Sequence, residues 1–163
     1  MIMKLIQVQL STFTVLEQFV HYYLNEIYGY IDGIEMDEYG NYIYGGLEEY
    51  VINPDLRAFL IYDEERYKGF VLVNKGRYAP KGYDYTIHEL YVAKPYRHQK
   101  IATKILEALF EHYKGKYFVM QLEKNNQAIR FWHKFLDQQE ISYVEKRRNI
   151  DGEPCLTQTF LII

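Results

Sequence analysis

The chain has 163 residues, of which 48% are hydrophobic, and a formal net charge of −3 at pH 7. This length suits a single domain that buries its own core without disulfides or structural metals. No run approaches the roughly 18 consecutive apolar residues of a membrane span, and the first ten residues are too short and polar for a secretory signal. We therefore expect a cytoplasmic protein without a membrane partner. The one cysteine, Cys155, has no His/Cys cluster of metal-ligand spacing around it, so we interpret it as structural and expect no metal.

Charge is distributed unevenly along the chain. Residues 1–56 hold nine acidic side chains and one basic one, a balance of −8, so residues 57–163 carry +5. Such a division suits a protein that binds a polyanionic cofactor on one side and a cationic substrate on the other, although ordinary solvated surface is the alternative. The basic part lacks a helix-length basic face and the whole chain is acidic, which argues against nucleic-acid binding.

The first part of the chain predicts a strand at residues 4–10 and a helix at residues 14–28. Gly29 is a plausible end for this helix. Residues 30–54 are irregular and rich in tyrosine, glycine and acidic side chains, with a short helix at 47–52. A long irregular segment in a compact domain is usually disordered or functional, and the many aromatic residues argue against disorder.

The middle of the chain predicts a meander followed by a helix. Apolar runs at residues 58–62 and 67–73 flank a polar turn and indicate a β-hairpin. A third strand follows at residues 85–92, and Pro95 ends it because proline cannot continue a central ladder. Apolar residues four apart then indicate an amphipathic helix that starts near Gln99.

The last part predicts a strand at residues 117–122, a helix at 125–136, and strands at 141–147 and 156–163. The strand at 117–122 is apolar on both faces and follows a crossover helix, so we expect it to lie parallel to the strand before that helix. The sheet should therefore be mixed and mostly antiparallel, with one βαβ unit.

The turn before the central helix is basic. Lys94, Arg97 and Lys100 lie where the first helical N–H groups have no partner within the helix. Unpaired N–H groups, the positive end of the helix dipole and nearby cations together predict an anion site, most naturally for a phosphate. A basic helix start that simply faces water is the alternative.

The same region resembles the acyl-CoA signature of the GNAT acetyltransferase superfamily. The residues that carry the resemblance are Val92-x-x-Pro95-x-Arg97-x-x-Lys100-x-Ala102. Lys100 departs from the family pattern, which usually has glycine there. A lysine in a helical conformation would still offer its backbone N–H, so we expect the phosphate cradle to survive.

A second motif lies in the last helix. Asn125-x-x-Ala128-x-x-Phe131-Trp132 is similar to the family pattern N-x-x-A-x-x-F-Y, with tryptophan in place of the final tyrosine. In the family this tyrosine is often the acid that reprotonates the departing thiolate. An indole N–H cannot deliver that proton, so another group or solvent must do so, and we interpret Trp132 as core or cleft wall. Asn125 is expected to cap its helix, to reach the pantetheine arm or the substrate side of the cleft, or both.

The resemblance implies the GNAT fold in a single domain of residues 1–163. This fold is of the α+β (α/β) class, with a mixed, mostly antiparallel central sheet of about seven strands, a central βαβ unit and about four helices. It also implies acetyl-CoA as co-substrate. The implied cofactor contacts are Leu90, Tyr91, Val92, Arg97, His98, Gln99, Lys100, Ile101, Ala102, Thr103 and Asn125.

Acetyl transfer to an amine requires a base, because an ammonium must lose its proton before its nitrogen can attack the thioester. Glu89 and His88 are the candidates, since the family's catalytic acids and bases commonly lie just before the signature valine. An acidic residue of the 30–54 segment is a further alternative. Adjacent strand residues point to opposite faces, so we expect at most one of Glu89 and His88 to face the cleft. The resemblance places the oxyanion donor at the backbone N–H near Val92.

The sequence thus predicts an acetyl-CoA-dependent N-acetyltransferase in which a primary amine attacks the thioester directly. The acidic, aromatic segment at residues 30–50 suggests a cationic small molecule or a peptide amine as substrate. The alternative is a CoA-binding or sensory module with little or no turnover, suggested by Lys100 and Trp132. We expect a monomer, or a homodimer paired through the apolar residues 159–163.

Overall fold

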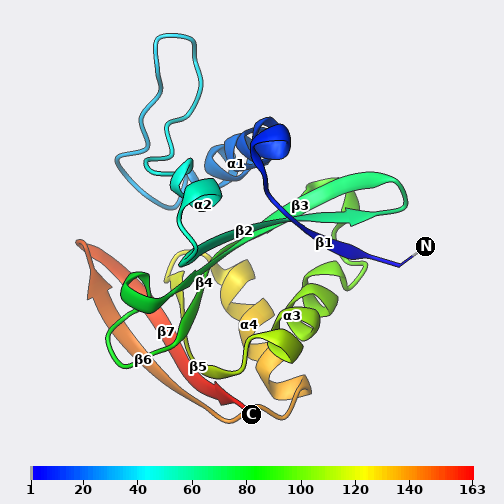
Figure 1. Ribbon diagram of the computed structural model, residues 1–163. Coiled ribbons are helices and arrows are strands. Elements are labelled where there is room, and N and C mark those ends of the chain that lie inside the picture. Colours follow the sequence, from blue (N-terminus) through cyan, green and yellow to red (C-terminus); the bar gives the residue numbers. More distant parts are fainter. Residues whose placement is uncertain (1) are drawn as a thin grey trace.

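The computed structural model describes residues 2–163 and contains one seven-stranded sheet in the order β1-β2-β3-β4-β5-β7-β6 (Figure 1). The strands are β1 (Lys4–Gln7), β2 (Leu56–Asp63), β3 (Arg66–Lys75), β4 (Tyr85–Val92), β5 (Gly115–Leu122), β6 (Tyr143–Ile150) and β7 (Glu153–Ile162). The helices are α1 (Phe13–Ile27), α2 (Glu49–Ile52), α3 (Ile101–His112) and α4 (Asn126–Gln138).

Neighbouring strands are antiparallel except for β4 and β5, which are parallel and joined by α3. This confirms the predicted mixed sheet with a single βαβ unit. Helices α1 and α2 cover one face of the sheet, and α3 and α4 cover the other (Figure 1). Each face buries its own apolar cluster, one centred on Leu16, Val20 and Leu24 of α1 and the other including Ile105 and Leu109 of α3. Among residues 2–163, no helix has both the length and the hydropathy to cross a membrane.

Most predicted elements lie within two residues of their observed bounds, and β4 has the bounds predicted for it. β1 is shorter than predicted because residues Leu10–Thr12 form a 3-10 turn. α3 begins at Ile101 instead of Gln99 because the preceding residue has a left-handed backbone conformation. The closing strand β7 lies between β5 and β6, so residues 159–162 are paired within the chain and provide no free edge for a dimer.

β4 and β5 separate along most of their length. In the described residues they pair only at Tyr85↔Tyr117 and Thr86↔Phe118. Beyond these pairs, the rest of β4 bonds to β3 alone. A gap therefore separates the two central strands over the rest of their length, with one edge of β4 open toward it.

A β-bulge interrupts β4 beside this gap. Ile87 lies opposite Val73 and Glu89 lies opposite Leu72, so His88 is the extra residue. A bulge breaks the alternation of side chains along a strand. The side chains of His88 and Glu89 therefore lie on the same face, that of α1 and α2, with His88 Nε2 4.0 Å from Glu89 Oε1. The expectation that these adjacent residues point to opposite faces was wrong.

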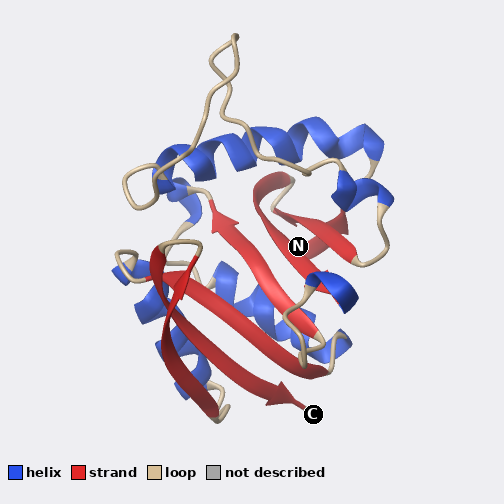
Figure 2. Cartoon of the chain, turned by 90° about the vertical axis from the view of Figure 1, so that its left-hand side faces the viewer, coloured by secondary structure: helices blue, strands red, loops and turns tan. Residues whose placement is uncertain are grey.

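The connection between α1 and α2 forms an arm that projects from the domain (Figure 2). Its outer part is closed by an isolated antiparallel bridge between Met36 and Tyr42. Below this bridge the arm is anchored on α1. The Tyr42 N–H donates to His21 Nδ1 (3.2 Å), and the Tyr42 hydroxyl donates to Asn25 Oδ1 (2.8 Å). The prediction that this irregular segment is not disordered agrees with these anchoring contacts.

Candidate active site

The loop between β4 and α3 presents a row of backbone donors. A 3-10 turn at Lys94–Tyr96 leads into two residues with positive φ, His98 (+64°) and Lys100 (+61°). Within the described residues, the N–H groups of residues 98–103 make no hydrogen bond. Unpaired N–H groups at the start of a twelve-residue helix fit the diphosphate of a nucleotide cofactor.

Lys100 does not have the helical conformation expected from the sequence. Its φ of +61° and ψ of +20° lie in the left-handed region, where glycine is favoured. This explains why the family pattern has glycine at this position. A residue with a Cβ loses about 1 kcal/mol in such a conformation. Its backbone N–H still belongs to the row of unpaired donors.

Arg97 points away from this row of donors. Its Nε donates to the Val92 carbonyl (2.8 Å), and its Nη1 and Nη2 each donate to a carboxylate oxygen of Glu26 on α1 (2.7 Å each). The guanidinium also lies over the Tyr91 ring, 5.4 Å from its centroid. Its hydrogen bonds to Glu26 raise the pKa of Arg97. Contrary to the sequence-based expectation, this side chain is engaged within the protein and joins α1 to the end of β4.

Glu89 lies beside the gap between β4 and β5, and two tyrosines hold its carboxylate. The Tyr23 hydroxyl, from α1, donates to Oε2, and the Tyr44 hydroxyl, from the base of the arm, donates to Oε1 at 3.3 Å. The Glu89 side chain is 17% exposed and that of His88 is 45% exposed. Burial raises the pKa of Glu89, and nearby His88 and the two hydroxyl donors offset this only in part. A carboxylate with a raised pKa is suited to accept a proton near neutral pH.

The two tyrosines remain donors under ordinary conditions. Burial is the main cause that raises the pKa of Tyr23 and of Tyr44, and the neighbouring negative charge of Glu89 raises both further. Each phenol therefore keeps its proton and directs it at the carboxylate. Nothing in the sequence around either tyrosine indicated this role, because the contacts join residues 45 and 66 positions apart.

A hollow of about 390 Å³ opens on the same side of the sheet as Glu89. Its lining includes His88 of β4, Asn74 of β3, Glu49 and Tyr50 of α2, and Tyr44. Tyr44 thus contacts both the hollow and Glu89. A second hollow of about 380 Å³ lies at the other end of β4, around Tyr85 and Lys114. There β4 and β5 are still paired, so no open strand edge adjoins it.

The second sequence motif has a structural role. Trp132 is 6% exposed and packs edge-on against Phe131 and Phe135, at ring distances of 5.8 and 6.1 Å. Its interpretation as core is confirmed. Asn125 caps α4 through its Oδ1, which accepts from the Ala128 N–H at 3.2 Å. Its side-chain NH₂ makes no hydrogen bond within residues 2–163, so it remains able to reach a ligand.

Comparison with known proteins shows which family has this architecture. A model of the acetyltransferase (GNAT) family matches residues 16–137, well over half of the chain. No curated protein matches. An acetyltransferase from Thermus thermophilus has 18% identity and a TM-score of 0.67, over 98% of this chain and 96% of that one.

Two further solved structures contain the cofactor. An acetyltransferase from Bacillus anthracis in complex with acetyl coenzyme A has 11% identity and a TM-score of 0.61, over 100% of both chains. The PaiA N-acetyltransferase from Thermoplasma acidophilum in complex with coenzyme A has 14% identity and a TM-score of 0.60, over 97% of this chain and 98% of that one. At these identities the likeness shows the fold alone. Through the family match, the chain belongs to the acetyltransferase (GNAT) family and is an acyltransferase whose co-substrate is acetyl-CoA.

Proposed function

We propose that this enzyme is an N-acetyltransferase for a primary amine and that Glu89 is its general base. The observation that carries the proposal is the position of the Glu89 carboxylate, held by the Tyr23 and Tyr44 hydroxyls beside the gap between β4 and β5.

The reaction follows from this arrangement. The ammonium of the acceptor loses a proton to Glu89, directly or through a water, and its nitrogen forms a bond to the carbonyl carbon of the thioester. A backbone N–H at the open edge of β4 near Val92 stabilises the oxyanion. The attacking nitrogen gives its second proton to solvent, the carbon–sulfur bond breaks and the thiolate leaves, so that a neutral amide remains. The thiolate is a good leaving group because its conjugate thiol has a pKa of about 8.5. Solvent can then protonate the thiolate, so no acid is needed at Trp132.

The cofactor contacts come mainly from the backbone. The N–H groups of residues 98–103 would bind the diphosphate, and the open edge of Leu90, Tyr91 and Val92 would pair with the pantetheine arm. Asn125 would add its side-chain NH₂. Lys94 and Lys100, which have no ion-pair partner among residues 2–163, would balance the phosphate charge. Two structures of the same fold contain acetyl coenzyme A or coenzyme A, which supports the proposal that this chain binds such a cofactor.

His88 is the second candidate for the base. Its imidazole lies 4.0 Å from Glu89 and lines the hollow, so it is close to where an acceptor amine would enter. Its side chain is more exposed than that of Glu89, 45% against 17%. We favour Glu89 because its burial and its two hydroxyl donors fix the position of the carboxylate.

Two measurements test the proposal. Calorimetry should detect acetyl-CoA binding, and release of free thiol should then depend on an added primary amine. Binding without thiol release from any amine in a broad panel would favour the alternative, a CoA-binding or sensory module. Absence of binding would contradict both functions.

A further inference from the structure

We propose that the hollow beside Glu89 binds an aliphatic diamine, with the amine to be acetylated at Glu89 and a second, cationic amine at Glu49. This inference deepens the proposed function and rests on it. The hollow is the candidate acceptor site because Tyr44 lines it and also donates a hydrogen bond to Glu89.

The walls of the hollow offer rings and not hydroxyl groups. The Tyr50 hydroxyl donates to Asn74 Oδ1 at 2.5 Å, and the Tyr44 hydroxyl donates to Glu89. The Tyr78 hydroxyl accepts from Asn53 Nδ2 and from Arg77 Nη2, both at 2.8 Å. Each of these hydroxyls already has a partner within the protein, and the three rings together with Ile43 and Leu56 leave a mainly apolar surface for a ligand. Such walls suit methylene groups, and the face of a tyrosine ring can also attract an ammonium.

This chemistry discriminates between classes of amine. An aminoglycoside carries many hydroxyls and a peptide carries backbone amides, and each polar group loses free energy when it leaves water without a partner. The engaged tyrosines offer few partners to such groups. An aliphatic chain between two amines has no polar group to satisfy, so it is the class that the walls fit best.

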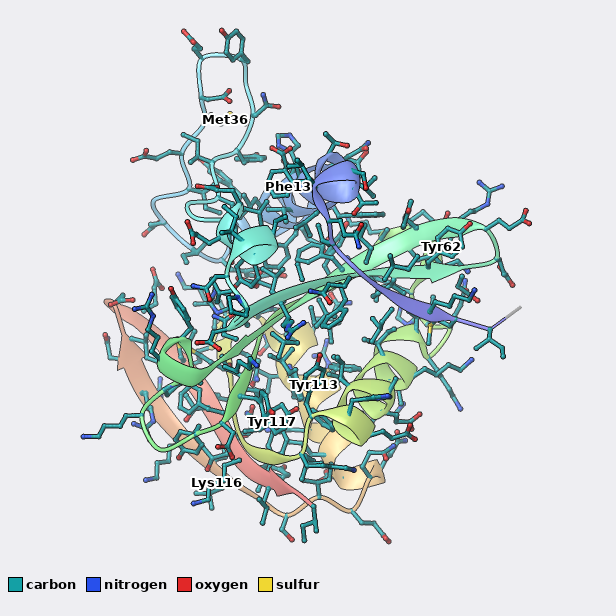
Figure 3. All side chains as sticks on the ribbon, in the orientation of Figure 1. Phe13, Met36, Tyr62, Tyr113, Lys116 and Tyr117 are labelled. Carbon is teal, nitrogen blue, oxygen red and sulfur yellow. The ribbon has the colours of Figure 1, made fainter. Side chains whose placement is uncertain are left out.

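Glu49 supplies the charge for the second amine. Within residues 2–163 its side chain has no ion-pair or hydrogen-bond partner, and it lines the hollow at the first residue of α2. The other acids of this connection lie elsewhere. Asp37 accepts hydrogen bonds from the Tyr39 and Asn41 N–H groups and follows Met36, which lies on the arm away from the sheet (Figure 3). Glu49 is thus the carboxylate that lines the hollow, and Glu89 lies next to it through its hydrogen bond with Tyr44.

The test compares 1,4-diaminobutane with butylamine, which has the same carbon chain and one amine fewer. In the wild type the diamine should have the lower KM. Glu49→Gln should raise the KM for the diamine about three- to fivefold, the range of an exposed ion pair, with kcat nearly unchanged. The same substitution should leave the KM for butylamine unchanged.

Glu48→Gln is the matched control, because it removes the same charge from the neighbouring exposed residue that does not line the hollow. Equal effects of the two substitutions would overturn the proposal, since they would indicate general electrostatics only. So would a wild type that prefers butylamine, or one that acetylates a lysine peptide with a higher kcat/KM than the diamine. If thiol is released with these other amines but the diamine is not preferred, the proposed function stands and only the diamine inference fails. If none of the amines causes thiol release, both the proposed function and the diamine inference fail.

Discussion

The two ends of the active site are built in different ways. At the proposed cofactor end, the diphosphate site is one continuous stretch, residues 94–103, whose donors are backbone N–H groups fixed by a loop and a helix start. The acceptor side draws side chains from α1, the base of the arm, α2, β3 and β4. A ligand with an invariant diphosphate can be bound by local backbone geometry, whereas acceptor recognition depends on side chains that only tertiary packing assembles.

Helix α1 connects the two ends. Tyr23 and Glu26 are three residues apart, so they lie on neighbouring positions of one helix face. Tyr23 donates to Glu89 on the acceptor side, and Glu26 forms a bidentate ion pair with Arg97 at the cofactor end. The position of α1 therefore influences both the base and the loop that precedes α3. Substitutions at these sites separate the contributions of the two ends to turnover, acetyl-CoA binding and stability.

The largest effect is expected from Glu89→Gln, which removes the proposed base and leaves the residues of the proposed cofactor end unchanged. General-base catalysis typically contributes about 100-fold or more, so kcat should fall by at least that factor at neutral pH. Calorimetry should show acetyl-CoA affinity nearly unchanged. His88→Ala is the comparison variant, and a larger loss of kcat for it than for Glu89→Gln would reverse the assignment of the base.

Glu26→Gln should break the connection between α1 and the cofactor end. It removes one carboxylate from a half-buried bidentate pair, in which the side chains of Arg97 and Glu26 are 19% and 25% exposed. We expect a loss of about 1–2 kcal/mol in the free energy of unfolding, measured by denaturant titration, and a higher KM for acetyl-CoA. Glu17→Gln, an exposed position on the same helix, is the control and should change neither quantity.

Lys100→Gly should stabilise the protein, because glycine adopts a φ of +61° without a steric penalty. The free energy of unfolding should rise by about 1 kcal/mol. Lys104→Gly, within α3, should lower it by about the same amount because glycine is a poor helix former. A destabilised Lys100→Gly variant would contradict the left-handed conformation of Lys100.

The smallest effect is expected from Tyr23→Phe and should appear in the pH profile. Hydrogen bonds to a carboxylate stabilise its charged form, so loss of this donor raises the pKa of Glu89 further above the usual 4.5. Glu89 must be deprotonated to act as base, and the acid limb of kcat/KM should therefore move to higher pH. Tyr22→Phe, on the exposed side of α1, should leave the limb in place. A limb that moves to lower pH would exclude this role of Tyr23.

The sequence by itself determined much of the fold and the location of the cofactor end. Hydrophobic periodicity and turn residues are local signals, which is why β4, α1 and the βαβ unit were predicted within a residue or two. The motif from Val92 to Ala102 could be found for the same reason, since the loop and the helix start that form the row of N–H donors are contiguous. The conformation of Lys100 was not predicted, because local sequence does not show when a residue other than glycine adopts a positive φ.

Only the tertiary structure decided how the acceptor side is assembled. The β-bulge that places His88 and Glu89 on one face arises from the pairing of β4 with β3, and it overrides the alternation that the sequence predicts. Arg97 is turned from the anion site by Glu26, 71 residues away. Tyr23 and Tyr44 belong to no motif. Their hydrogen bonds to Glu89 join distant segments, which packing brings together and which no spacing along the chain encodes.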